Sequence, residues 1–344
     1  MAYTTINKST DYFNTKLYSG NASTQSITGI NFQPDLIWGK ARDAAETHDL
    51  VDAVRGNTKY LATPSNSAET TASNGVTSFN SDGFSLGART SLNGSGMTFA
   101  TWNWKAGTTS IPTGSTSDPS AVSINATSGF GIYKITAPGS GNYVLKHGLG
   151  ATPAMVIVKR TDGTQGWMVW HNTFSNATDD YIQFNTDAAK GTYSSCWGTM
   201  NSTDCTIATG GTLDVNGEHI IYVFTKVTGY SKFGAYTHNG ASGDTGTFVN
   251  LGFKPSFLMI KNTSAASTDW IMYDSTRSPM NSVDDCLFPN ESSAESVNYN
   301  MTFLSNGFKL NGSGPAMGSS GNVVIYAAFG QSLVGSNDVP CTGF

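Results

Sequence analysis

The chain has 344 residues with a net charge of −5, and only 12% of its residues are charged, whereas serine and threonine (40 and 43 residues) make up about a quarter. This weak acidic balance without basic runs argues against a nucleic-acid-binding protein, which needs cationic groups to contact phosphates. The 38% of hydrophobic residues, with 18 Phe, 14 Tyr and 7 Trp, excludes wholesale disorder.

No run reaches the roughly 18 unbroken apolar residues of a membrane helix. The first ten residues, MAYTTINKST, lack the apolar run of a secretory signal. We therefore expect no insertion into a membrane.

A proline that precedes a lysine by six residues, with an apolar run between them, occurs at three places along the chain. Similar landmarks follow each of these anchors in the same order, which indicates three tandem repeats. The anchors are Pro34–Lys40, Pro153–Lys159 and Pro255–Lys261; after them come His48–Asp52, Trp167–His171 and Trp270–Asp274, then Leu61 to Ala68, Tyr181 to Ala188 and Leu287 to Ala294, and finally Gly96–Trp104, Gly217–Phe224 and Gly321–Phe329.

Most of these landmarks have the pattern of β-strands. Apolar and polar residues alternate with period two in 98–104 and 167–171, as in strands with one buried face. Asn-Gly pairs at 93–94, 216–217 and 306–307 are typical of type I′ hairpin turns. The sequence therefore predicts an all-β fold of three tandem antiparallel β-sandwich, jelly-roll-like repeats of about 100 residues each.

The composition sets the expected domain boundaries. Repeat one covers residues 1–106, repeat two covers 129–228, and repeat three, with a C-terminal tail, covers 229–344. Residues 107–128 are mostly Ser, Thr and Gly with two prolines, which predicts a polar linker. Since no comparable segment separates repeats two and three, we expect those two to pack as neighbours.

The four cysteines, Cys196, Cys205, Cys286 and Cys341, show neither a CxxC pair nor the spacing of a zinc site. We expect free thiols. A bridge between Cys196 and Cys205 across a hairpin is the alternative.

The five histidines favour structural roles. His171 aligns with an aspartate in each of the other repeats, so this position at the end of a recurrent strand requires a polar group, and His48 lies at the opposite end of the same strand. We expect His147 and His238 in surface turns, with a ligand or metal role as the alternative. His219 is expected near the start of a strand.

Two Asp-x-x-Arg pairs, Asp52 with Arg55 and Asp274 with Arg277, occupy the same place in repeats one and three. One interpretation is a catalytic or sugar-binding pair. The favoured one is a salt-bridge clamp within a loop. Repeat two has a histidine and a phenylalanine instead, so the fold does not require the pair.

A catalytic constellation is not visible. A glycoside hydrolase needs two carboxylates about 5 to 9.5 Å apart, and the candidates 179–180 and 284–285 do not lie in apolar strands that would raise a pKa. The segment Asp214–Glu218 resembles a shortened calcium loop but is better explained as an Asn-Gly hairpin. We therefore predict a non-enzymatic protein without catalytic, cofactor-binding or metal-binding residues and without a cofactor. Polar loops rich in Gly and Asn near Trp and Tyr would suit carbohydrate.

Several longer strings resemble a family from marine bacteriophages whose members are described as tail-fibre-like or virion structural proteins. These strings lie at 12–21, 29–42, 48–56, 81–84, 147–150, 229–234 and 304–309. The resemblance implies a virion surface protein that forms part of a tail fibre or receptor-binding apparatus and recognises a host surface glycan or protein. Its expected partners are other virion proteins and further copies of itself, with a trimer as the expected form.

Two alternatives follow from the same resemblance. The first is a capsid decoration or head-fibre protein, and the second is a glycan depolymerase. Since the first repeat begins about twelve residues after Met1, with no room for an adaptor or fibrous shaft, we expect a short virion protein or the tip of a larger assembly.

Overall fold

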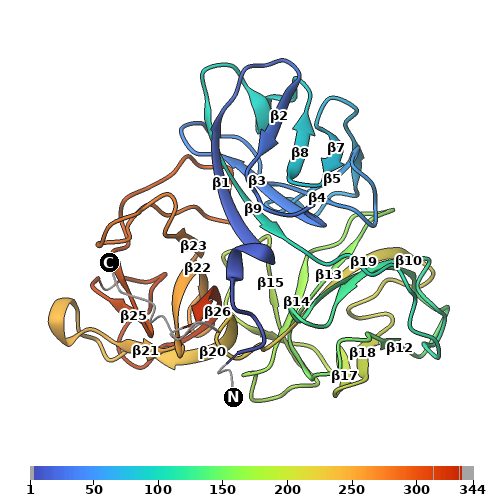
Figure 1. The fold of residues 1–344 in the computed structure, drawn as a ribbon. Helices are drawn as coiled ribbons and strands as arrows, with labels where there is room; N and C mark the ends of the chain where they lie inside the picture. Colours follow the sequence, from blue (N-terminus) through green and yellow to red (C-terminus); the bar gives the residue numbers. More distant parts are fainter. Residues whose placement is uncertain (1–3, 313, 333, 335–344) are drawn as a thin grey trace.

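The computed structural model describes residues 4–312, 314–332 and 334, and it shows three lobes built almost entirely of antiparallel strands (Figure 1). Each lobe has a larger sheet and a three-stranded sheet, so the prediction of an all-β, sandwich-type fold is confirmed. The helical segments are short turns, η1 (Ser9–Asp11), α1 (Thr90–Asn93) and η2 (Gly243–Thr245). Within the described residues, no helix is long and apolar enough to cross a membrane.

Repeat one forms the lobe coloured blue to cyan in Figure 1. Its larger sheet has the order β1 (Phe13–Ser19), β9 (Thr98–Trp104), β3 (Leu36–Ala41), β4 (Asp49–Asp52), β5 (Lys59–Ala62) and β6 (Thr70–Thr71), and its smaller sheet has the order β2 (Gln25–Thr28), β8 (Gly83–Leu86) and β7 (Val76–Asn80).

Repeats two and three have the same core order of strands. In repeat two the larger sheet is β10 (Ala121–Asn125), β11 (Phe130–Thr136), β19 (Glu218–Thr225), β13 (Pro153–Arg160), β14 (Met168–His171), β15 (Asp180–Gln183) and β16 (Gly191–Thr192), beside β12 (Asn142–Lys146), β18 (Asp204–Ala208) and β17 (Trp197–Met200). In repeat three it is β20 (Ser231–Thr237), β26 (Val323–Ser332), β22 (Phe253–Asn262) and β23 (Trp270–Asp274), beside β21 (Phe248–Asn250), β25 (Gly307–Leu310) and β24 (Met301–Leu304).

The predicted anchors form a central strand of each larger sheet, β3, β13 and β22. These strands pair on both sides and are buried on both faces, which explains their continuous apolar runs. The pairing of β13 and β22 with the last strand of the repeat shifts register just after Pro153 and Pro255. A proline is tolerated at such a bulge because its missing N–H removes no regular ladder bond.

Three details of the sequence interpretation need correction. The expected linker 107–128 contains strand β10, which pairs with β11, so its second half belongs to repeat two. Asn93–Gly94 ends helix α1 and is not a hairpin turn. The third concerns repeat two, where Ile182 and not Tyr181 is equivalent to Leu61, because Val169 pairs with Ile182 as Leu50 pairs with Leu61.

The three lobes meet at the centre of the molecule (Figure 1). There, buried apolar side chains from all three repeats form one core. Trp104, Phe224 and Phe329 hold equivalent positions on the last strand of each repeat, and their rings form a closed triangle with centroids 5.8, 5.9 and 6.5 Å apart. The three repeats thus close into a ring in which each one contacts both others. Only apolar atoms of the surrounding side chains face a central void of about 30 Å³, so it offers no hydrogen-bonding partner for a bound water or ligand.

Main-chain hydrogen bonds repeat around this ring. At each boundary, a backbone N–H just before β6, β16 or the equivalent segment of repeat three is the donor. The acceptor is the carbonyl of the residue that follows the anchor strand of the neighbouring repeat. The three bonds are Glu69 to Thr161 (2.9 Å), Lys190 to Thr263 (3.1 Å) and Glu295 to Arg42 (2.7 Å).

Candidate functional site

Polar residues at the end of β4, β14 and β23 face the neighbouring repeat. The Tyr222 hydroxyl donates to Asp52 at 2.8 Å, and the Trp102 indole N–H donates to Asp274 at 2.9 Å. At the third boundary, His171 Nε2 lies 3.3 Å from the carbonyl oxygen of Tyr326. The expected structural role of His171 is therefore confirmed, and its position belongs to the ring contacts.

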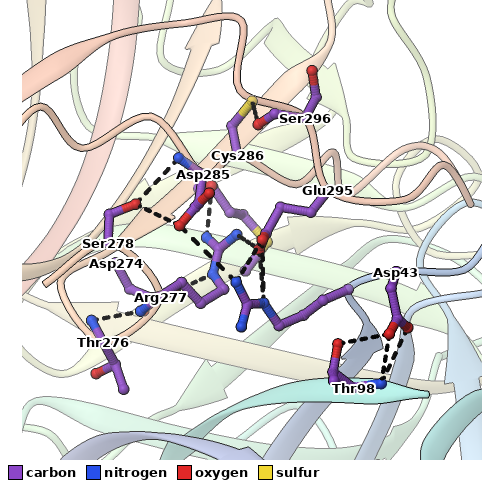
Figure 2. A network of polar contacts seen from close by, with 12 residues as sticks. Asp43, Thr98, Asp274, Thr276, Arg277, Ser278, Asp285, Cys286, Glu295 and Ser296 are labelled. Carbon is purple, nitrogen blue, oxygen red and sulfur yellow. Dashed lines mark hydrogen bonds and ion pairs between the residues drawn. The ribbon is translucent and has the colours of Figure 1, made fainter. Parts of the chain in front are cut away.

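The Asp-x-x-Arg pair of repeat three is a buried clamp (Figure 2). Asp274 accepts hydrogen bonds from the backbone N–H groups of Thr276 and Arg277 at 3.0 and 2.8 Å, while Arg277 Nε donates to its other oxygen at 2.5 Å. Arg277 also donates to Glu295 at 2.8 Å and to the carbonyl of Met272 at 3.0 Å. Burial opposes the charge on Arg277, but Asp274 and Glu295 outweigh it and raise its pKa.

Repeat one contains the same clamp. Arg55 Nε donates to Asp52 at 2.6 Å and Arg55 Nη2 donates to the carbonyl of Leu50 at 2.9 Å. Asp52 accepts in turn from the backbone N–H groups of Val54 and Arg55. Because every side-chain nitrogen and oxygen atom of the two pairs makes at least one hydrogen bond within its repeat or across the ring, the structure supports the favoured interpretation of a salt-bridge clamp.

Glu295 joins repeat three to repeat one. It accepts from Arg277 on one side and from Arg42 Nη2 and Nε on the other, at 2.6 and 3.0 Å. The hydrogen bond to Glu295 is the main reason that the pKa of Arg42 is raised. Nearby, Asp43 accepts from the N–H and hydroxyl of Thr98 (Figure 2).

The anchor lysines are buried, and two of them make ring contacts. Lys159 Nζ donates to the carbonyl of Asn66 in repeat one at 3.2 Å, and Lys261 Nζ donates to the carbonyl of Asp187 in repeat two at 3.1 Å. Lys40 donates to two carbonyls of its own repeat. Burial lowers the pKa of each of these ammonium groups to about 8.

Two histidines differ from expectation. His147 and His238 are 0% and 1% exposed, so their placement in surface turns is wrong. Their Nδ1 atoms accept the N–H of the residue two positions later, at 3.1 and 2.9 Å, which lets a turn close around a buried ring. His219 lies in β19 as expected, and burial lowers its pKa to about 4. Among the described residues, no three His, Cys, Asp or Glu side chains are grouped as metal ligands would be.

Of the carboxylates considered as acids, Asp179 and Asp180 are held in their charged form. The N–H of Ser195 donates to Asp179 and lowers the pKa of this carboxylate. Burial would raise the pKa of Asp180, but its ion pair with Lys190 and its hydrogen bonds outweigh burial and lower it. Sequence reasoning missed Asp35, whose pKa is raised by burial. Asp35 accepts hydrogen bonds from the N–H of Ala106 and from the hydroxyl of Ser123, and the second of these connects repeat one to β10. No local sequence motif predicts this long-range contact.

The described cysteines are free and buried. In the β17–β18 pair, Cys205 lies opposite Met200, whereas Cys196 precedes the strand and its carbonyl accepts from Ala208. The alternative of a Cys196–Cys205 bridge is therefore wrong. Cys341 lies outside the described residues.

An open pocket of about 350 Å³ lies on repeat two, next to backbone groups of Gln165 and Gln183 that bond to the neighbouring repeats. It forms between the strands β14 and β15 and the loops that precede β14, follow β16 and connect β18 to β19. Its lining residues are Gln165, Gly166, Met168, Tyr181, Gln183, Tyr193, Gly210, Gly211 and Asp214. Sequence reasoning found only the composition of these loops, because the pocket joins residues almost fifty positions apart.

The chain belongs to the family described as a domain of unknown function, DUF7483. The family model matches residues 8–332, which run from the residue before η1 to the last residue of β26. The family model therefore covers all three repeats of this chain. No curated protein and no solved structure matches the chain.

Chemically, the arrangement favours binding. The buried pairs Asp52–Arg55 and Asp274–Arg277 lie at the ring boundaries, and Asp179 and Asp180 have lowered pKa values. Amide, hydroxyl and aromatic groups gather in the pocket of repeat two.

Proposed function

We propose that this protein is a non-enzymatic surface protein of a bacteriophage virion, part of a tail fibre or receptor-binding apparatus that recognises a host surface glycan or protein. The observation that carries the proposal is the use of the buried charged groups: Asp52, Asp274 and Glu295 serve ring contacts. Ligand contacts are then left to the exposed loops and the pocket of repeat two. The resemblance of several longer strings to virion structural proteins supports the same role.

Imaging of virions labelled with an antibody against the chain tests the location. Label at the tail is the expected result. Label spread over the icosahedral faces would overturn it in favour of a capsid decoration or head-fibre protein. Purified protein is also expected to reduce adsorption of the phage to its host, and unchanged adsorption would contradict a role in recognition.

Two further parts of the proposal have their own tests. Incubation with host polysaccharide is expected to release no reducing ends, and their release would establish a depolymerase. Assembly into a homotrimer remains part of the proposal and predicts three times the chain mass of 36.3 kDa in mass photometry. A single-chain mass would leave the ring itself as the three-lobed unit.

A further inference from the structure

The pocket of repeat two contains polar groups that the protein does not use. Within the described residues, no hydrogen bond involves the hydroxyls of Tyr181 and Tyr193 or the side-chain amide of Gln183. Gln165 donates its amide N–H to the carbonyl of Thr212 at 3.1 Å, but its Oε1 is buried without a partner. Tyr193 is 54% exposed, so its ring is accessible to a ligand.

Two glycines keep the tyrosine rings in place. A Cβ at Gly191 would lie 2.7 Å from Tyr181 Cζ, and one at Gly211 would lie 3.0 Å from Tyr193 Cε1. Any larger residue at either position would displace the ring beside it. The local sequence is therefore compatible with both rings lying close to the backbone and presenting a face to the pocket.

In repeat one, the side chain of Arg89 fills the space that is equivalent to the pocket. Tyr60 is equivalent to Tyr181 and Asp49 is equivalent to Met168, as the strand registers show. Arg89 stacks over the Tyr60 ring at 3.7 Å from the centroid and donates to Asp49 at 2.6 Å. The space over this tyrosine thus accepts a flat group.

Repeat three closes the equivalent space with apolar groups. The bridge between Met272 and Leu287 makes Phe288 equivalent to Gln183 and Cys286 equivalent to Tyr181. Phe288 is 9% exposed and packs edge-on against Tyr299, with centroids 6.3 Å apart. Among the three repeats, the space is lined by free polar groups in repeat two alone.

We infer that the pocket of repeat two binds a neutral saccharide, which stacks on the faces of Tyr181 and Tyr193 and exchanges hydrogen bonds with Gln165 and Gln183. This inference names the ligand of the recognition role proposed above and rests on it. A sugar ring offers both an apolar face and hydroxyls that donate and accept, which matches aromatic rings beside amides. The volume lies at the small end of ligand pockets, which suits a short terminal glycan.

The charges around the pocket argue for a neutral ligand. Asp214 is the only charged lining residue, and Arg160 already donates to it at 3.0 Å. An anionic ligand would find no free cation there. An arginine of a protein partner would lack the carboxylate that Asp49 supplies in repeat one, because Met168 replaces it.

Saturation-transfer NMR on the full chain tests the inference with glucose, galactose, mannose, fucose, N-acetylglucosamine and N-acetylgalactosamine as probes. At least one sugar is expected to bind. Tyr193→Ala is expected to weaken that binding about tenfold, the loss of one stacked ring. Since the Tyr193 side chain makes no hydrogen bond to a described group, the variant is expected to keep the thermal midpoint of the wild type.

The matched control is Phe248→Ala, which removes an aromatic ring of similar exposure (47%) from repeat three and is expected to leave binding unchanged. Equal binding by Tyr193→Ala and wild type would overturn the pocket, as would the absence of binding to every sugar. Binding of an arginine-containing peptide that Tyr193→Ala abolishes would overturn the saccharide as ligand. None of these outcomes alters virion labelling, which judges the proposed function separately.

Discussion

Removal of the Arg277 guanidinium is expected to destabilise the ring at the boundary between repeats three and one. Arg277→Phe removes the bonds to Asp274, Glu295 and the carbonyl of Met272, and it leaves the buried carboxylate of Asp274 without its cation. Loss of one partner from a buried pair costs about 3–5 kcal/mol. Asp274 keeps three donors, two backbone N–H groups and the indole of Trp102, so we expect about 3 kcal/mol, the lower end of that range.

Repeat two supplies the compensating change, because His171 and Phe174 stand where repeat three has Asp274 and Arg277. His171 Nδ1 lies 2.8 Å from the hydroxyl of Thr173, and the equivalent residue in repeat three is Thr276. The double variant Asp274→His with Arg277→Phe therefore removes both charges and offers the imidazole a partner. We expect it to recover about 1–2 kcal/mol, which lies within the range of about 0.5–3 kcal/mol found for residues in direct contact.

Urea denaturation followed by tryptophan fluorescence measures these free energies of unfolding, and Trp102 lies 5.3 Å from the Arg277 guanidinium as a local reporter. Arg160→Ala is the control, since this arginine also binds two carboxylates but is partly exposed, and a loss below about 1 kcal/mol is expected. A coupling below about 0.5 kcal/mol between the two changes would refute the view that His171 and Phe174 substitute for the clamp.

Three further predictions concern buried groups. The pKa of Lys159 is about 8 in the folded chain and 10.5 ordinarily, so unfolding takes up a proton at any pH between these two values. In urea titrations, the difference between the free energies of unfolding of the wild type and of Lys159→Met should therefore rise from pH 8 to pH 10. A constant difference would contradict this prediction. Tyr222→Phe should cost about 1–2 kcal/mol by the same assay, because Asp52 loses a buried donor, and no loss would show that this ring contact is dispensable. Iodoacetamide should label Cys196 and Cys205 in peptide maps only after denaturation, and rapid labelling of the native chain would disprove their burial.

Much of each lobe could be predicted because a strand is encoded by the pattern of apolar and polar residues within its own few positions. The anchors from Pro153 to Lys159 and from Pro255 to Lys261 begin at a bulge and continue as doubly buried strands, as their apolar runs indicate. The one-residue error at Tyr181 has a simple cause: an aromatic residue there resembles a core residue, whereas the core position is Ile182. A pattern of period two cannot show which of two adjacent apolar residues points inward.

The contacts that close the ring could not be predicted in the same way. Trp102 and Asp274 are separated by 172 positions, and their hydrogen bond follows from how the lobes pack. The same reason explains the error at His147, whose polar, glycine-rich surroundings suggested a surface turn although backbone groups complete its hydrogen bonds in the interior. The pocket could not be predicted because Tyr181 stands out only by comparison with its equivalent Tyr60. The Arg89 side chain covers the Tyr60 ring, and only the structure shows this contact.

The three boundaries also explain why one repeat could specialise. Trp102 and Tyr222 donate to the smaller Asp274 and Asp52 of the neighbouring repeat. The strand registers make the small Ala327 their equivalent in repeat three, where the larger His171 contacts the carbonyl of the preceding Tyr326. A large residue at one position thus accompanies a smaller one at the other, which keeps the packed volume similar at each boundary. In a symmetric homotrimer every subunit would carry the same residues, so a change in one boundary or pocket would occur three times. A ring made of a single chain allows repeats one and three to keep the clamp and a filled pocket while repeat two gives up both.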